Sequence, residues 1–217
     1  MMTLHTLQIL KDHVTSQAPS GNPDLLLSAM DAFTRDTRHQ LMHLGPEKGL
    51  LLDQLIEDQA PKRILELGSF FGYSAIRMAR LIKGELVSLE SDPFHAAIAQ
   101  KLVRHAKLEN QITIHHTAAS HGIEHLKGQF DFILVDHYAS NYYTDLRILE
   151  DRNLLAQGCL LVADNALIHA HQMADYLHYV RNSPHYSSRL VKTPCQHIDG
   201  SQDGMEITRY LTDTGVK

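Results

Sequence analysis

Short oxygen-bearing side chains follow two of the apolar runs in this sequence, and their types indicate a chemistry. Asp136 follows the run 130–135, while Asp164 and Asn165 follow the run 159–163. Two carboxylates and an amide oxygen, completed by water and substrate oxygens, are the hard ligands that Mg²⁺ requires. As an alternative, each aspartate only caps the helix after it. The metal interpretation is favoured because the two runs are expected to form neighbouring strands.

A glycine turn in ILELGSFFGYSAIRMAR, residues 64–80, is the second candidate site. Glu66 and Gly68 end an apolar run, Gly72 closes the turn and an amphipathic run begins at Tyr73. This pattern predicts a buried parallel strand, a tight turn and a helix. A glycine at the end of a strand lets a ligand approach the backbone, and ligands bind at the carboxyl ends of such strands. Taken alone, the turn is equally typical of helix packing.

Glu90 lies about 20 residues beyond the glycine turn, where an acid accepts hydrogen bonds from ribose hydroxyls. Alternatively, Glu90 only favours the N-terminus of the helix that Asp92-Pro93 starts. LGSFFG is not GxGxxG, and the chain has no phosphate-binding GK[ST]. A pyrophosphate cofactor is therefore disfavoured, and a nucleoside without phosphates, such as S-adenosylmethionine, fits better.

The elements that must position these side chains follow from hydrophobic patterning. Strand-like runs occur at 64–67, 86–89, 112–115, 130–135 and 159–163, separated by helical segments. This alternation predicts a parallel sheet with helices on both faces. The loops after the first, second, fourth and fifth strands then share one edge, and each carries an acid. After Tyr186 we expect a loop and a last short strand at 205–211.

Three helices are expected before the first strand. Two lie between Leu4 and Leu41, separated at Pro19, Gly21 and Pro23 with Asn22 as a cap, and a third spans 46–59. Because no strand precedes them, they should form a lid or flank.

Length and composition limit the class of protein. The 217 residues, 43% apolar and 21% charged, fit one ordinary α/β domain spanning 1–217, without repeats or linkers. A net charge of −5 without a basic cluster argues against a nucleic-acid partner. Cys159 and Cys195 lack metal-type spacing, which suits free thiols. The start, MMTLHTLQILKDHV, has no long apolar core, so neither a signal peptide nor a membrane span is expected. A cytoplasmic protein without a membrane partner is the expectation.

Several stretches resemble catechol O-methyltransferase, a metal-dependent family of class I S-adenosylmethionine methyltransferases. They are LGPEKGLLLD, ILELGSFFGYSAIRMAR, SLESDP, LVDHY, LLAQGCLLVADN and DGMEITRY, from the N-terminal helices to the last strand. The resemblance implies a Rossmann-like fold with a mostly parallel seven-stranded sheet and extra N-terminal helices. It also implies methyl transfer from S-adenosylmethionine to a hydroxyl of a catechol-like small molecule, with Mg²⁺ or another divalent cation. A homodimer is a possible assembly under this resemblance.

Carried over by position, the resemblance implies the site residues. Those around the methionine part of the cofactor would be Met42, Leu44, Glu66, Gly68, Tyr73 and Ser74. Glu90 would hold the ribose, and Ser120, His121 and His137 would lie near the adenine. Asp136, Asp164 and Asn165 match the Mg²⁺ ligands, and Glu206 matches the acid that hydrogen-bonds the second catechol hydroxyl.

The match fails at the residue that would take the proton. The family has a general-base lysine three residues after the first metal-binding aspartate, where this chain has Ala139. The pocket rim also differs from the family: Tyr138 replaces a tryptophan, Gln40 replaces an aromatic residue and His169 replaces a proline. General-base catalysis contributes roughly 10²–10⁴-fold, so its loss predicts a slow enzyme unless another group replaces it.

Replacement bases, in order, are His169, Lys48 and His43, although a loop histidine such as His169 is more often solvated. Three functions follow from these residues. The first is a cation-dependent catechol O-methyltransferase. The second is a non-catalytic relative that binds cofactor or a protein partner. The third, a methyltransferase acting on nucleic acid or protein, is disfavoured by the net acidity.

Overall fold

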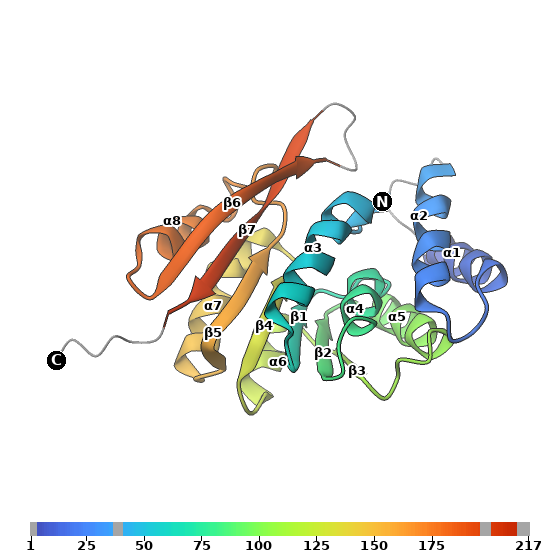
Figure 1. Ribbon diagram of the computed structural model, residues 1–217, viewed down its shortest axis with the longest axis horizontal. Helices are drawn as coiled ribbons and strands as arrows, with labels where there is room; N and C mark the ends of the chain where they lie inside the picture. The colour runs from blue at the N-terminus through green and yellow to red at the C-terminus, as the bar shows by residue number, and fades with distance from the viewer. Residues whose placement is uncertain (1–3, 37–40, 196–200, 212–217) are drawn as a thin grey trace.

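A computed structural model describes residues 4–36, 41–195 and 201–211. Its centre is a seven-stranded sheet in the order β3-β2-β1-β4-β5-β7-β6 (Figure 1). The strands are β1 (Arg63–Leu67), β2 (Glu85–Glu90), β3 (Ile112–His116), β4 (Phe130–Val135), β5 (Leu155–Ala163), β6 (Tyr186–Pro194) and β7 (Gln202–Tyr210). The first five strands pair in parallel, and β7 runs antiparallel to both β5 and β6. The predicted mostly parallel, Rossmann-like sheet is confirmed.

Strand β6 corrects the sequence prediction, because the stretch after Tyr186 was expected to be a loop. Residues 186–194 instead pair with β7 along the whole strand. As an edge strand, β6 carries no continuous apolar run, and its residues alternate between more and less exposed positions. Pro194 ends it, where a missing ladder hydrogen bond is tolerated. Its partner β7 starts earlier than predicted, at Gln202.

Helices cover both faces of the sheet, as predicted. They are α1 (Leu4–Gln17), α2 (Pro23–Asp36), α3 (Gly45–Gln59), α4 (Tyr73–Ala79), α5 (Pro93–His105), α6 (Ala119–His125), the 3₁₀ helix η1 (Ala139–Asn141), α7 (Tyr142–Asp151) and α8 (Ala174–Asn182). Helices α3, α4 and α5 share one apolar cluster with the sheet, and α6, α7 and α8 share the other. Helices α1 and α2 flank α5 and α4 (Figure 1). Asn22 accepts a hydrogen bond from the Leu25 amide at 3.0 Å, the predicted cap.

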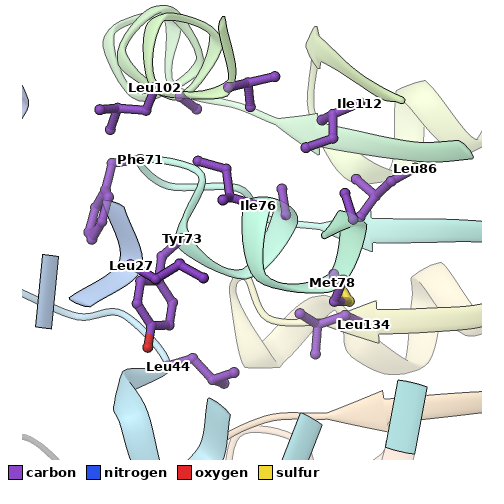
Figure 2. Packing of buried hydrophobic residues seen from close by; sticks show 14 of the residues in the cluster. Leu27, Leu44, Phe71, Tyr73, Ile76, Met78, Leu86, Leu102, Ile112 and Leu134 are labelled. Atoms are coloured by element: carbon purple, nitrogen blue, oxygen red, sulfur yellow. The ribbon is translucent and has the colours of Figure 1, made fainter. Parts of the chain in front are cut away.

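Helix α4 joins the N-terminal helices to the sheet. Figure 2 shows the ring of Tyr73 near Leu27 of α2 and Leu44, just before α3. On α3, Asp53 accepts four hydrogen bonds of 2.6–2.9 Å from Arg77 and Arg80. Charge-assisted, bidentate pairs of this kind fix orientation as well as distance. They therefore hold α3 in place relative to the end of β1. No helix within the described ranges is long and apolar enough to cross a bilayer.

Candidate active site

The strand register brings the predicted site residues to one edge of the sheet. Leu67 pairs with Leu89 and with Val135, and Val135 pairs with Ala163. The residues that directly follow these four are Gly68, Glu90, Asp136 and Asp164, in the same order as Leu67, Leu89, Val135 and Ala163. Backbone hydrogen bonds continue the ladder, since the Asp136 amide donates to Leu67 and the Asp164 amide donates to Val135 at 2.9 and 3.0 Å. The acids therefore converge as the alternation of strands and helices predicted.

Glu66 is fully buried beneath the glycine turn. Its carboxyl group accepts hydrogen bonds from the Ser74 hydroxyl at 2.5 Å and from the Ser88 hydroxyl. Burial raises the pKa of Glu66 to about 7, the two serine hydroxyls oppose that rise, and the nearby Glu90 charge adds to it. A carboxyl group with this pKa gains a proton near neutrality unless a cation is present. It is therefore suited to receive a positively charged part of a ligand.

Glu90 organises the glycine turn itself. One carboxylate oxygen accepts hydrogen bonds from the backbone amides of Ser69 and Phe70, at 3.0 and 2.8 Å, and the other accepts from the Asp92 amide. Asp92, rather than Glu90, caps α5. Gly68 has φ +99°, and a methyl group there would lie 2.3 Å from the Asp136 carbonyl oxygen. The turn thus needs glycine at this position, while a ribose contact for Glu90 stays a prediction.

The other predicted cofactor residues lie in different environments. Ser74 joins Glu66, whereas the buried ring of Tyr73 packs against His43, with 4.7 Å between ring centroids, as part of the core. Leu44 is buried and Met42 is exposed. Ser120 and His121 lie exposed on α6. No hydrogen bond joins Tyr73, Ser120 or His121 to Glu66 or Glu90, and their cofactor contacts stay predictions.

His137 follows Asp136 and turns toward α7. Its Nε2 lies 2.6 Å from an oxygen of the buried Asp145, and its ring stacks on Tyr142 with 5.2 Å between centroids. These contacts fix the ring orientation. An adenine contact for His137 stays a prediction.

Lys48 links the predicted metal ligands to α3. Its ammonium group donates to Oδ1 of Asp164 and to Oδ2 of Asp203, both at 2.6 Å, and all three side chains are buried. Burial alone would lower the pKa of Lys48, but the two carboxylates raise it. Lys48 is therefore an ammonium ion, so it cannot accept a proton from a substrate. This placement removes it as a replacement base.

The donor set fits a hard divalent cation. No residue in the described part of the chain donates a hydrogen bond to the Asp136 carboxyl group, whose pKa is raised by burial and by the charge of Asp164. Lys48 bonds only Oδ1 of Asp164, which leaves Oδ2 of the same carboxylate as a possible ligand atom. The Asn165 amide donates through Nδ2 to Asp203 at 2.9 Å, which leaves its Oδ1 as an acceptor. Among the described residues, no three His, Cys, Asp or Glu side chains are arranged to hold a metal ion. The predicted set consists of two carboxylates and an amide.

Glu206 does not join this set, and its predicted contact with a catechol hydroxyl stays a prediction. Its carboxylate is fully buried and accepts hydrogen bonds from Arg181 of α8 at 2.9 and 2.6 Å and from Ser188 at 2.7 Å. Neighbouring residues in a strand point to opposite faces, and Met205 and Ile207 pack in the cluster of α3. Glu206 therefore faces α8, with both oxygens engaged.

The remaining predicted residues lie in different parts of the structure. His169 is part of the turn that follows Asn165, and its amide donates to the Asn165 carbonyl at 2.9 Å. Ala139 is 5% exposed and packs in the cluster of α6, α7 and α8, while Tyr138 is 72% exposed. His43 is buried against Phe71 and Tyr73. Gln40 lies outside the described residues.

Asp203 is the site residue that sequence reasoning missed. Its carboxylate receives Lys48 and the amide of Asn165, so it contacts two of the side chains that build the edge. The signal in the sequence was its place at the start of DGMEITRY, three residues before Glu206.

The fold and the acidic strand-end site define a protein of the Rossmann-like methyltransferase class. The O-methyltransferase family model matches residues 17–182. The chain is 34% identical over 212 residues to catechol O-methyltransferase B of Danio rerio, covering 94% of this chain and 77% of that protein. It is 32% identical over 206 residues to a transmembrane O-methyltransferase of Homo sapiens, covering 91% and 70%. The chain belongs to the O-methyltransferase family, and its resemblance to catechol O-methyltransferases is confirmed.

Solved structures share the fold at lower sequence identity. The O-methyltransferase TomG from Streptomyces achromogenes, in complex with SAM, superposes with a TM-score of 0.76 at 19% identity, covering 97% of this chain and all (100%) of that chain. An O-methyltransferase from Bacillus cereus in complex with SAH gives a TM-score of 0.73 at 20% identity, with 96% and 100% covered.

Replacing Lys48 with Met is expected to lower the free energy of unfolding by about 3–5 kcal/mol, because removing one partner leaves buried carboxylates without their counter-charge. Urea denaturation in EDTA measures the change. Lys83→Met removes the same charge from an exposed position and should change stability by less than about 0.5 kcal/mol. Equal effects of the two substitutions would show that the Lys48 ammonium does not stabilise the site.

Glu66 predicts a pH dependence of stability. Its pKa is about 7 in the folded protein and near 4.5 in the unfolded chain, so between these values only the folded protein keeps the proton. The free energy of unfolding should therefore fall as pH rises from about 4.5 to about 7, by roughly 3 kcal/mol from this group. Glu66→Gln should remove that contribution in urea denaturation on both sides of pH 7, while the exposed Glu109→Gln should not. Parallel pH profiles for wild type and Glu66→Gln would contradict this assignment.

Proposed function

We propose that this protein transfers the methyl group of S-adenosylmethionine to one hydroxyl of a catechol-like small molecule, with a divalent cation such as Mg²⁺. One observation carries the proposal: Asp136, Asp164 and Asn165 present oxygen ligands beside the Glu66 and Glu90 turn. Similarity to catechol O-methyltransferases over most of the chain supports the substrate class. The net charge of −5 agrees with a small-molecule substrate rather than nucleic acid.

Two ligand sites are assigned to the chain's own residues. Asp136, Asp164 and Asn165 would hold the cation, which when bound lowers the pKa of a coordinated phenol and orients the two oxygens of a diol. Glu66 in its ionised form would attract the positively charged methionine part of the methyl donor, and Glu90 would receive the ribose. Binding both reactants in line supplies most of the rate enhancement of a displacement.

The proton acceptor is the step in which this chain differs from its family. Ala139 has no titratable group, and Lys48 is an ammonium ion held by two carboxylates. His169, four residues after Asn165 along the chain, is the histidine that we assign to this step. Solvent can take the proton more slowly, so the reaction should accelerate as pH rises.

The assay combines the purified protein, S-adenosylmethionine and a panel of vicinal diols, with monophenols as controls, in Mg²⁺ or in EDTA. Mass spectrometry should detect methylated diol only with the cation, and the rate should rise with pH. Asp136→Asn should abolish product while leaving S-adenosylmethionine binding intact. His169→Gln should lower the rate by roughly 10²-fold or more if His169 is the base, and by much less if solvent is.

Ala139→Lys tests the missing base directly. Because residue 139 is buried in an apolar cluster, Ala139→Met is the matched control for the extra bulk without the amine. Product from Ala139→Lys but neither from wild type nor from Ala139→Met would show that catalysis was lost at this residue. Cofactor binding without product from wild type, Ala139→Lys or any diol would overturn the proposal in favour of a non-catalytic binding protein.

A further inference from the structure

Asp203 is buried, yet its carboxylate receives four hydrogen bonds. Oδ2 accepts from the Lys48 ammonium at 2.6 Å and from the Asn165 amide at 2.9 Å. Oδ1 accepts from the backbone amides of Leu167 and Ile168, at 3.3 and 3.2 Å. One carboxylate on β7 therefore joins α3 to the turn after β5.

The contact with Asn165 decides which side-chain atom faces the cation site. An amide group is nearly symmetric in shape, and its orientation is set by the hydrogen bonds available to its nitrogen and oxygen. Because a carboxylate can only accept, Asp203 selects Nδ2 of Asn165 and leaves Oδ1 for the cation. A reversed amide would present N–H groups to the cation and could not coordinate it.

The backbone of the same turn is also fixed by Asp203. Asn165 has φ +60°, in the left-handed region, which few residues other than glycine and asparagine adopt readily. The bonds to the amides of Leu167 and Ile168 hold the chain immediately after this position. The left-handed turn is thereby kept in the geometry that Asn165 needs as a ligand.

Lys48 completes the arrangement. Its ammonium group bridges Asp203 and Asp164, so Asp203 also determines how Lys48 approaches the metal-ligand carboxylate. Lys48 bonds two carboxylates, so without a negative charge at residue 203 only Asp164 of this pair would remain. The Lys48 charge would then act entirely on a cation ligand.

We propose that Asp203 is a positioning residue of the cation site, which presents the Asn165 amide oxygen to a divalent cation and shares the Lys48 ammonium with Asp164. This inference rests on the proposed function, because it needs the cation site at Asp136, Asp164 and Asn165. Asp203 itself does not touch the cation or the reacting atoms.

The test measures cation binding rather than turnover. Mn²⁺ is titrated into wild type and Asp203→Asn, bound ion is followed by electron paramagnetic resonance, and Mg²⁺ competition confirms a shared site. Outer residues that orient metal ligands typically account for 10–100-fold in metal affinity, so Asp203→Asn should weaken Mn²⁺ binding by that factor. Its affinity for S-adenosylmethionine, measured calorimetrically in EDTA, should stay within about twofold of wild type.

Glu206→Gln is the matched control, because it changes a fully buried carboxylate on the same strand that faces α8 instead. It should reduce thermal stability without altering Mn²⁺ affinity. Equal loss of Mn²⁺ affinity in both variants would overturn the inference, since loosening of β7 would then explain the effect. Unchanged Mn²⁺ affinity in Asp203→Asn would also overturn it, while leaving the proposed function intact.

A double-mutant cycle tests the route through Asn165. Asn165→Gly tolerates the positive φ but removes the ligand, so adding Asp203→Asn should weaken Mn²⁺ binding little further. If Asp203→Asn does not fold, Asp203→Glu replaces it: this variant keeps the charge but displaces the carboxylate, and the same loss of Mn²⁺ affinity is expected. Absence of Mn²⁺ binding in wild type would overturn the proposed cation site, and this inference with it.

Discussion

The contact of the Lys48 ammonium with Asp164 and Asp203 offsets the cost of collecting acids at one edge of a buried sheet. Asp136, Asp164, Asp203, Glu66 and Glu90 converge there, and Lys48 is the cation that hydrogen-bonds two of them. Desolvating a carboxylate costs several kcal/mol unless a partner compensates it. The site therefore depends on α3 placing Lys48 at the carboxyl end of β5 and the start of β7. Asp53, with Arg77 and Arg80, holds α3 in the position from which Lys48 reaches them.

The pKa values of the acids at this edge are displaced in both directions, because hydrogen bonds lower the pKa of Glu90 and of Asp203 despite their burial. Burial and neighbouring acids raise the pKa of Glu66, Asp136 and Asp164, and burial with the charges of Asp136 and Asp164 raises that of the Tyr142 phenol. One ammonium ion does not balance this set. In the proposed function, two positively charged ligands, a sulfonium methyl donor and a divalent cation, would supply the missing charge.

Much of this arrangement could be predicted from the sequence because it follows from strand order. The alternation of apolar runs and helical segments predicts which strand ends share an edge, and so brings Asp136 and Asp164 together. The acid of β7 that contacts Lys48 could not be predicted, because it depends on which face of the strand a side chain occupies. Asp203 and Glu206 are three residues apart, so they point to opposite faces of β7, and only the observed register shows which one meets Lys48. Strand β6 was missed for a related reason, since an edge strand lacks the apolar run that marks the central strands.

The burial of Ala139 has a consequence for how proton transfer could have changed in this chain. A lysine at this position would have to leave the apolar cluster that Ala139 joins with Tyr142 and the helices of that face. Tyr142 cannot substitute, because its raised pKa keeps the phenol protonated. The ring nitrogen Nε2 of His137 is engaged by Asp145. The other ring nitrogen of His137, Nδ1, is buried without a hydrogen-bond partner among the described residues. The proposed function assigns the proton acceptor to His169, in the turn after Asn165, or to solvent. Asp203 accepts hydrogen bonds from the backbone of that turn, so the residue that we propose to orient the cation ligand also holds the backbone next to the proposed base.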